Sequence, residues 1–260
     1  MMKIKLSSSW QYIQPEEQEA LAGIVAEAGS LQPDGCVPVL WKTRNKFVLL
    51  LELQNGRKVV FKAPLKVKNV LKYCFRLSPY AREALNFYHI RQLEIPTVKF
   101  LAAGEFRTFF KLRKGFLITE FAEGFSDGFD FVPGKIHEGE PALVRDFTEQ
   151  NFRLLARLHN HRMIHNGFTP GNMLYRKRQE PDADGNMLEI LWIDLASCRR
   201  VRWPQNYWRW IAPDIVHFFS FFQFTDEEKL HYLQVYCRES RSGFTPERLL
   251  KLVASCRPRR

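Results

Sequence analysis

Residues 165–175 read HNGFTPGNMLY, and after a polar turn residues 192–197 read WIDLAS. These two segments are the most informative part of the sequence for the fold. The apolar runs at 173–175 and 188–193 have the length and composition of short strands. The pattern predicts a hairpin that carries one polar side chain at each end. These side chains are Asn172, just before the first strand, and Asp194, just after the second.

Upstream of this stretch the sequence predicts a small region rich in strands. Residues 47–53 are apolar and of strand length, Asn55-Gly56 is a favoured short hairpin turn, and a second strand returns to end at Lys62. A helix and two further strands are expected next, over residues 79–93, 98–104 and 116–121.

The C-terminal half has a different character. Residues 126–141, rich in Gly, Asp and Pro, predict a loop or the seam between two lobes, and residues 142–161 then show the clearest helical period. The most apolar segment, 207–224, contains Arg209 and Asp214, which are costly in a bilayer, so a buried helix is expected there. The chain is therefore expected to be α+β, with a small β-rich N-lobe and a larger helical C-lobe. The expected parts are an N-terminal extension over 1–36, the N-lobe over 37–124 and the C-lobe over 125–260.

The composition limits the function classes. Hydrophobic residues make up 45% of the chain and charged residues 26%, which is the profile of a folded protein. The formal charge of +11 favours an anionic partner, such as nucleic acid, anionic lipid or a phosphorylated glycan. No helix-turn-helix, zinc or RNP signature is present, so nucleic acid is not expected. The five cysteines form no CxxC pair and the N-terminus has no apolar signal-peptide core, so a reducing cytoplasm is expected.

Lys62 and Glu83 are candidates for holding a nucleotide. Phosphoryl transfer needs positive charge near the nucleotide phosphates and oxygen ligands for Mg²⁺, because the transition state is negatively charged. Lys62 ends a strand, and Glu83 on the following helix is placed to pair with its ammonium group. Taken alone, Lys62 has the pattern of an ordinary edge-strand lysine. The segment 165–197 changes that interpretation.

The order of these motifs resembles that of kinase-like phosphotransferases. In that fold a His-x-Asp-x₄-Asn loop precedes an apolar strand, and an aspartate ends the next strand. His165, Asn172 and Asp194 keep those places and that spacing. Over roughly residues 37–220 the chain is similar to the lipopolysaccharide core kinase family, the WaaP/InaA group. That family phosphorylates sugars of the inner core of Gram-negative lipopolysaccharide.

The resemblance implies a protein-kinase-like fold, ATP and Mg²⁺ as cofactors, and lipopolysaccharide core or another anionic glycolipid as substrate. It places the protein in the cytoplasm, peripheral on the inner membrane at an anionic surface, and leaves the oligomeric state open. The catalytic positions that it implies are His165, Gly167 (where the family has Asp), Asn172 and Asp194, and the metal ligands are Asn172 and Asp194. The nucleotide-binding positions are Lys62, Glu83, Glu120 and Ala122. Asp214 is expected to hydrogen-bond the catalytic loop.

Two departures from the kinase pattern bear on activity. No GxGxxG precedes Phe47, and Gly167 stands where an aspartate would accept the proton of the substrate hydroxyl. A general base contributes about 10² to 10⁴-fold, so turnover would be slow without it. Asp194, or an aspartate of the hairpin turn at 182 or 184, is an alternative base. The alternative function is a catalytically impaired pseudokinase that acts as an envelope or stress-response scaffold.

Three histidines lie close together in the sequence at His159, His161 and His165. Their spacing is compatible with metal binding, but no further Cys or Asp ligand is near them in the sequence. We therefore expect a structural role, in which the histidines order the loop backbone through hydrogen bonds.

Overall fold

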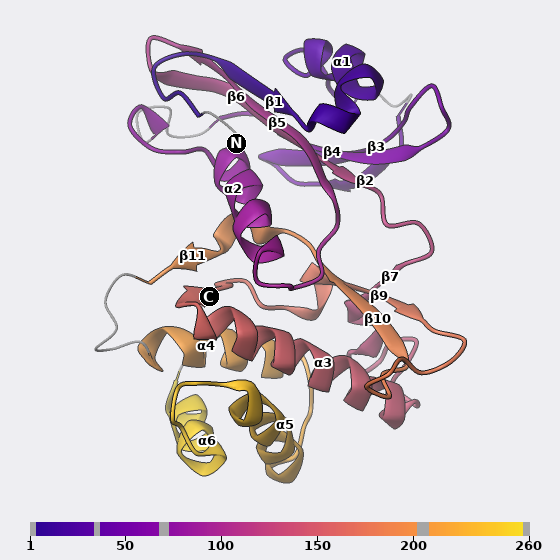
Figure 1. Cartoon of the computed structure of the whole chain (residues 1–260), viewed down its shortest axis with the longest axis vertical. Coiled ribbons are helices and arrows are strands. Elements are labelled where there is room, and N and C mark those ends of the chain that lie inside the picture. Colours follow the sequence, from indigo (N-terminus) through magenta and orange to yellow (C-terminus); the bar gives the residue numbers. More distant parts are fainter. Residues whose placement is uncertain (1–3, 34–36, 68–72, 202–207, 257–260) are drawn as a thin grey trace. The chain divides into compact units, whose positions relative to one another are not determined.

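The computed structural model describes residues 4–33, 37–67, 73–201 and 208–256 of the chain (Figure 1). Two compact units are formed, one by Met1–Tyr88 with Val98–Glu123 and the other by His89–Thr97 with Gly124–Arg260. The predicted α+β class is confirmed, because strands dominate the first unit and helices the second.

The first unit is built on a six-stranded antiparallel sheet in the order β1-β5-β6-β4-β3-β2. Its strands are β1 (Trp10–Ile13), β2 (Val39–Lys42), β3 (Lys46–Glu52), β4 (Lys58–Pro64), β5 (Phe100–Thr108) and β6 (Lys111–Glu120). Its helices are η1 (Pro15–Glu17), α1 (Gln18–Glu27) and α2 (Pro79–Arg91), whose last turn belongs to the second unit.

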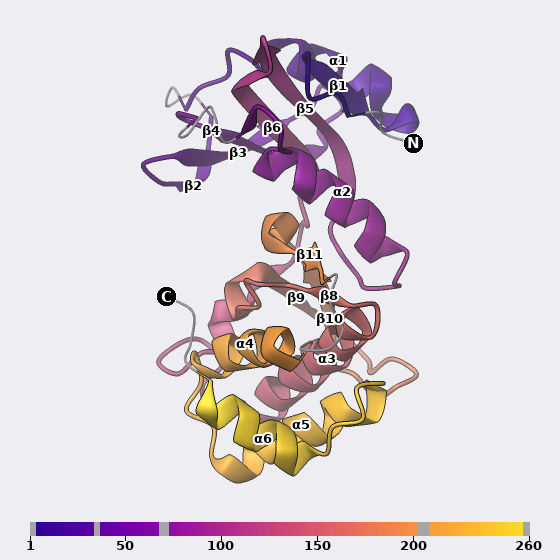
Figure 2. The ribbon, with the colours of Figure 1, turned by 90° about the vertical axis from the view of Figure 1, so that its left-hand side faces the viewer.

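The two long helices of the first unit lie on opposite faces of the sheet (Figures 1 and 2). Alternate residues of β3 and β4, including Phe47 and Phe61, are fully buried in a core that contains Leu21 and Val25 of α1. Because side chains alternate along a strand, Lys62 lies on the face away from that core. The sequence of β4 thus separates a packing face from a face that presents a charged group.

The second unit combines helices with two small sheets, ordered β10-β9-β7 and β11-β8. Its strands are β7 (Ser126–Asp127), β8 (Met163–Ile164), β9 (Met173–Lys177), β10 (Leu188–Trp192) and β11 (Arg199–Arg200). Its helices are η3 (Gly128–Phe131), α3 (Pro141–Asn160), η4 (Pro170–Asn172), η5 (Leu195–Ser197), α4 (Trp208–Phe219), α5 (Asp226–Glu239) and α6 (Pro246–Ser255). Aromatic rings fill the core, where Phe152, Phe168 and Phe218 are fully buried and pack against one another.

Several elements differ from the sequence-based expectation. Within the segment expected as an N-terminal extension, β1 pairs with β5 and α1 packs on the sheet. The segment 126–141, expected as a loop or the seam between two lobes, contains β7 and η3. The apolar helix ends at Phe219 instead of continuing to residue 224. Among the helices of the described residues, none has both the length and the apolar character needed to cross a membrane.

Candidate functional site

Lys62 and Glu83 form a buried ion pair in the first unit. The Lys62 Nζ donates to Glu83 Oε2 at 2.8 Å and to Oε1 at 3.0 Å, and the two side chains are only 13% and 2% exposed. Glu83 lies on α2, whose N-terminus is capped. The Ser78 hydroxyl accepts a hydrogen bond from the Ala81 N–H at 3.1 Å, and Pro79 is the first residue of the helix. The predicted partnership of Lys62 and Glu83 is therefore present in the structure.

Glu120 and Ala122 follow one another at the end of the sheet. Glu120 is the last residue of β6, and its backbone N–H donates to the Lys99 carbonyl at 2.9 Å. The next backbone N–H, of Phe121, donates to the Lys58 carbonyl at 3.2 Å, and Ala122 then leaves the strand. Their assignment to nucleotide binding stays a prediction.

Asp214 organises the loop that contains His165 and Gly167. Its carboxylate accepts hydrogen bonds from the backbone N–H of His165 at 2.8 Å and of Asn166 at 2.7 Å. It also lies 3.3 Å from His159 Nε2, and Asp214 itself is only 2% exposed. The expected hydrogen bonding of Asp214 to the loop is thus seen. Asn166 was not among the predicted site residues. Its backbone has positive φ and turns the chain at this point.

Asn172 closes the same loop and joins it to the hairpin. Its side-chain Nδ2 donates to the Gly167 carbonyl at 2.7 Å, and its own carbonyl accepts from the Ile193 N–H at 2.9 Å. The Nδ2 bond fixes the amide so that Oδ1, which can only accept hydrogen bonds or bind a cation, is directed away from Gly167. Asn172 therefore lies beside the end of the strand that leads into Asp194.

Asp194 is held in a conformation that is uncommon for an aspartate. Its φ is 50° and its ψ is 59°, in the left-handed region, and it precedes the short helix η5. Such backbone outliers cluster at functional sites. The amide oxygen of Asn172 and the carboxylate of Asp194 are hard oxygen donors of the kind that Mg²⁺ binds, usually together with substrate phosphates and waters. The residues present thus suit the metal that the sequence predicts.

Gly167 leaves room for a side chain. A Cβ atom built on it would lie 3.7 Å from Asn172 Nδ2, 3.7 Å from His165 Nδ1 and 3.9 Å from Ser197 Cβ, which are ordinary contact distances. Its φ is outside the left-handed region that favours glycine. Glycine at this position is therefore required neither by packing nor by the backbone.

The histidines and turn aspartates have structural surroundings. Burial lowers the pKa of both His159 and His165, so each is a neutral imidazole at pH 7. His159 Nδ1 lies 2.9 Å from the Tyr236 hydroxyl. Neither ring nitrogen of His165 has a hydrogen-bond partner among the described residues, so the expected hydrogen bonding of this side chain to the loop is not seen. Asp182 accepts four hydrogen bonds within its own turn, from Asp184 and Asn186. In the part of the chain that the structure describes, no three His, Cys, Asp or Glu side chains form one cluster, so the three histidines do not make a metal site of that kind.

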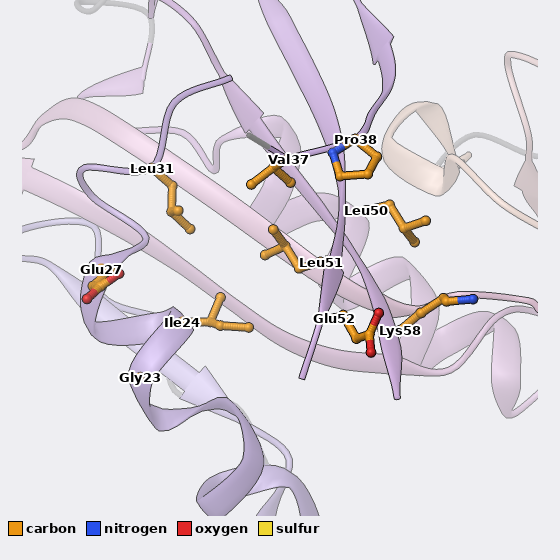
Figure 3. Close-up of a pocket in the computed structure, with 10 residues that line it drawn as sticks. All are labelled: Gly23, Ile24, Glu27, Leu31, Val37, Pro38, Leu50, Leu51, Glu52 and Lys58. Atoms are coloured by element: carbon orange, nitrogen blue, oxygen red, sulfur yellow. The ribbon is translucent and has the colours of Figure 1, made fainter. Parts of the chain in front are cut away.

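The first unit also contains a pocket of about 620 Å³, shown in Figure 3. Apolar side chains of Ile24, Leu31, Val37 and Leu51 line it, with the charged groups of Glu27, Glu52 and Lys58 nearby. None of the residues predicted to bind nucleotide lines this pocket. It is therefore separate from the Lys62 and Glu83 pair.

Comparison with known proteins identifies the family of the chain. The family model described as "Lipopolysaccharide kinase (Kdo/WaaP) family" matches residues 64–236, which is more than half of the chain. The chain belongs to this family. The family match includes Glu83, Gly167, Asn172, Asp194 and Asp214, and it begins just after Lys62. No curated protein sequence matches the chain.

Solved structures extend the comparison of this lipopolysaccharide kinase family member to its fold. The structure titled "WaaP in complex with acyl carrier protein" is 17% identical, with a TM-score of 0.65 and 95% coverage of both chains. The Rio2 kinase from Chaetomium thermophilum, in an ADP/Mg²⁺-phosphoaspartate complex, is 15% identical, with a TM-score of 0.50 and coverage of 91% of this chain and 69% of its own. The predicted protein-kinase-like fold is confirmed.

Proposed function

We propose that this family member is an ATP-dependent kinase that phosphorylates a sugar of the lipopolysaccharide inner core, and that it works on the cytoplasmic side of the inner membrane. The observation that carries the proposal is the two-point pair between Lys62 and the buried carboxylate of Glu83. A paired and positioned lysine is the arrangement that kinases use to hold nucleotide phosphates. Burying such a pair is costly, so its presence here supports a function.

The chain's own residues divide the work as follows. Mg-ATP, when bound, supplies the phosphoryl group and neutralises its developing charge. Glu83 orients the Lys62 ammonium, which is the cation for the nucleotide phosphates. Asn172 Oδ1 and the Asp194 carboxylate would hold the metal, and the Asp214 carboxylate holds the loop that contains His165 and Gly167. Glycine at residue 167 has no side chain to accept the proton of the acceptor hydroxyl, so Asp194 or an aspartate of the turn at 182 or 184 would have to accept it.

The acceptor is proposed from the family and from charge. Members of this family are lipopolysaccharide kinases, and a chain with a net charge of +11 suits an anionic glycolipid at an anionic membrane surface. The solved WaaP structure is a complex with acyl carrier protein, so an acyl carrier protein is a candidate partner for this chain as well.

The test is transfer of labelled phosphate from ATP to dephosphorylated lipopolysaccharide core by the purified chain. Lys62→Ala and Asp194→Ala are expected to abolish transfer. Lys58→Ala, which removes a lysine of the same strand that pairs at the surface with Glu123, is the matched control and should retain it. Lys62→Arg keeps a cation beside Glu83, so it checks that loss of activity is not loss of folding. Equal transfer by wild type and both alanine variants would refute the proposal.

Gly167 favours the second candidate, a pseudokinase that acts as a scaffold. Calorimetry with Mg-ATP separates the two functions. Binding that depends on Lys62, with no transfer to any core acceptor, would support the scaffold. Binding and transfer that are both lost on Asp194→Ala would support the kinase.

A further inference from the structure

The turn between β5 and β6 exposes two phenylalanines in an unfavourable backbone conformation. Thr108 pairs with Lys111, so Phe109 and Phe110 are the two central residues of the hairpin turn. Both have positive φ, 47° and 64°, and they are the one adjacent non-glycine pair of this kind within the described ranges. Asn-Gly is the usual choice for such a turn, because bulky side chains are strained there. The long hairpin that carries the turn can be followed in Figure 2.

These aromatic rings are exposed and are joined by a third. Phe109 is 89% exposed and Phe110 is 44% exposed. Phe75, on the segment before α2, is 80% exposed, and its ring centroid lies 6.0 Å from that of Phe110. Large apolar side chains that gather at the surface in this way usually mark an interaction site. We call Phe75, Phe109 and Phe110 the aromatic tip.

A buried arginine fixes the two segments that form the aromatic tip. Arg107 is 7% exposed, and its guanidinium donates to the carbonyls of Tyr73 at 2.7 Å, Phe110 at 2.9 Å and Arg76 at 3.2 Å. Its Nε donates to the buried carboxylate of Glu105 at 2.7 Å. The carbonyls on both sides of Phe75 and at Phe110 are thus held by one cation. The tip is therefore a built feature and not a loose loop end.

The charge around the aromatic tip has one sign. Residues 53–82 and 106–119, which contain the tip, include no Asp or Glu. Arg76, Lys111 and Arg113 are exposed next to the three phenylalanines. Anionic lipid surfaces attract such basic groups, while aromatic rings partition into the boundary between headgroups and acyl chains.

We propose that the aromatic tip docks this protein on an anionic lipid bilayer, with Phe75, Phe109 and Phe110 inserted at the interface and Arg76, Lys111 and Arg113 on the lipid headgroups. Three phenylalanines bury at most about 450–750 Å². That is less than the roughly 800 Å² per partner of a stable protein interface, whereas insertion into lipid needs no complementary surface. The inference rests on the proposed membrane-peripheral function, for which it supplies the contact surface.

The test is co-sedimentation of the full chain with vesicles of phosphatidylcholine alone or of phosphatidylcholine with phosphatidylglycerol. Wild type is expected to bind the anionic vesicles, more weakly as salt rises. Phe109→Asn with Phe110→Gly installs the preferred turn pair, so the variant should be at least as stable as wild type yet bind at least tenfold more weakly. Phe75→Ser, which leaves the turn intact, should also weaken binding. Ile136→Ser removes an exposed apolar side chain elsewhere and is the control.

Two double charge-reversal variants test the electrostatic contribution to lipid binding. Lys111→Glu with Arg113→Glu is expected to weaken binding to anionic vesicles at least tenfold. Arg241→Glu with Lys251→Glu changes the net charge equally at exposed positions of the second unit and should not. Equal binding by wild type and the aromatic variants overturns the proposal, as does failure of wild type to bind anionic vesicles at low salt. Binding of a soluble acidic protein through Phe109 and Phe110, without vesicle binding, also overturns it. Vesicle binding needs no ATP, so neither its success nor its failure decides the proposed transfer.

Discussion

Gly167→Asp is expected to raise the rate of phosphoryl transfer by about 10² to 10⁴-fold, the usual contribution of a general base. The factor corresponds to a barrier lower by about 2.7–5.5 kcal/mol. The structure admits the side chain: its Cβ would lie 3.7 Å from Asn172 Nδ2 and from His165 Nδ1, and the backbone φ is one that any residue adopts. The loop would not have to move, because Asp214 already holds the N–H groups of His165 and Asn166.

The assay is the initial rate of labelled phosphate transfer from ATP at saturating acceptor. Gly167→Asn is the matched control, because it has nearly the same size but no carboxylate to accept a proton. The increase should appear in kcat, with the KM for ATP nearly unchanged, since residue 167 is not among the positions proposed to bind nucleotide. Equal rates for the Asp and Asn variants, both folded and both binding Mg-ATP, would refute the reasoning that position 167 alone limits turnover.

Three further outcomes are expected from the buried polar groups. Lys62→Ala should lower the unfolding free energy measured in urea by about 3–5 kcal/mol, because the buried Glu83 loses the Lys62 ammonium. Lys62→Met with Glu83→Leu should recover most of that loss without restoring nucleotide binding. Asp214→Asn should lower the unfolding free energy by about 3 kcal/mol, because an amide NH₂ would face the N–H groups of His165 and Asn166. Asp226→Asn, at an exposed ion pair, is the control and should change the unfolding free energy by less than about 0.5 kcal/mol. Chemical denaturation measures both variants. Burial keeps the pKa of His159 below its ordinary value, so below about pH 6.5 the unfolded chain takes up a proton that the folded chain does not. In urea denaturation at several pH values, stability should then fall with acidification by up to about 1.4 kcal/mol per pH unit for this histidine, and less steeply in His159→Gln.

The parts of the fold that were predictable carry local signals. Asn55-Gly56 between two apolar runs predicted the β3–β4 hairpin. The apolar runs at 173–175 and 188–193 predicted the β9–β10 hairpin. β1 was missed because its partner β5 lies far along the chain, and a four-residue strand has little signal of its own. The β5–β6 turn was missed because Phe-Phe is not a turn sequence.

The candidate site was predictable where a motif fixes the spacing of chemical groups. His165, Asn172 and Asp194 could be placed by spacing and Asp214 by the family resemblance, and the structure gives the hydrogen bonds that hold the loop. Arg107 could not, because it lies within a run of basic residues that suggests a solvated face. Its burial depends on Glu105, two positions earlier on the same face of β5. Arg107 also donates to the carbonyls of Tyr73 and Arg76, more than 30 residues earlier in the chain, and contacts at that separation are not visible in the order of residues.

The carboxylate of Glu105 joins the aromatic tip to the lysine pair within one unit. One oxygen accepts from Arg107, which holds the tip, and the other accepts at 3.0 Å from the N–H of Ser78, which caps the helix that carries Glu83. Hydrogen bonds and one helix thus connect the aromatic tip to the Lys62 ammonium. Thermodynamic linkage then sets a symmetry: any factor by which lipid contact changes the affinity for nucleotide is also the factor by which nucleotide changes the affinity for lipid.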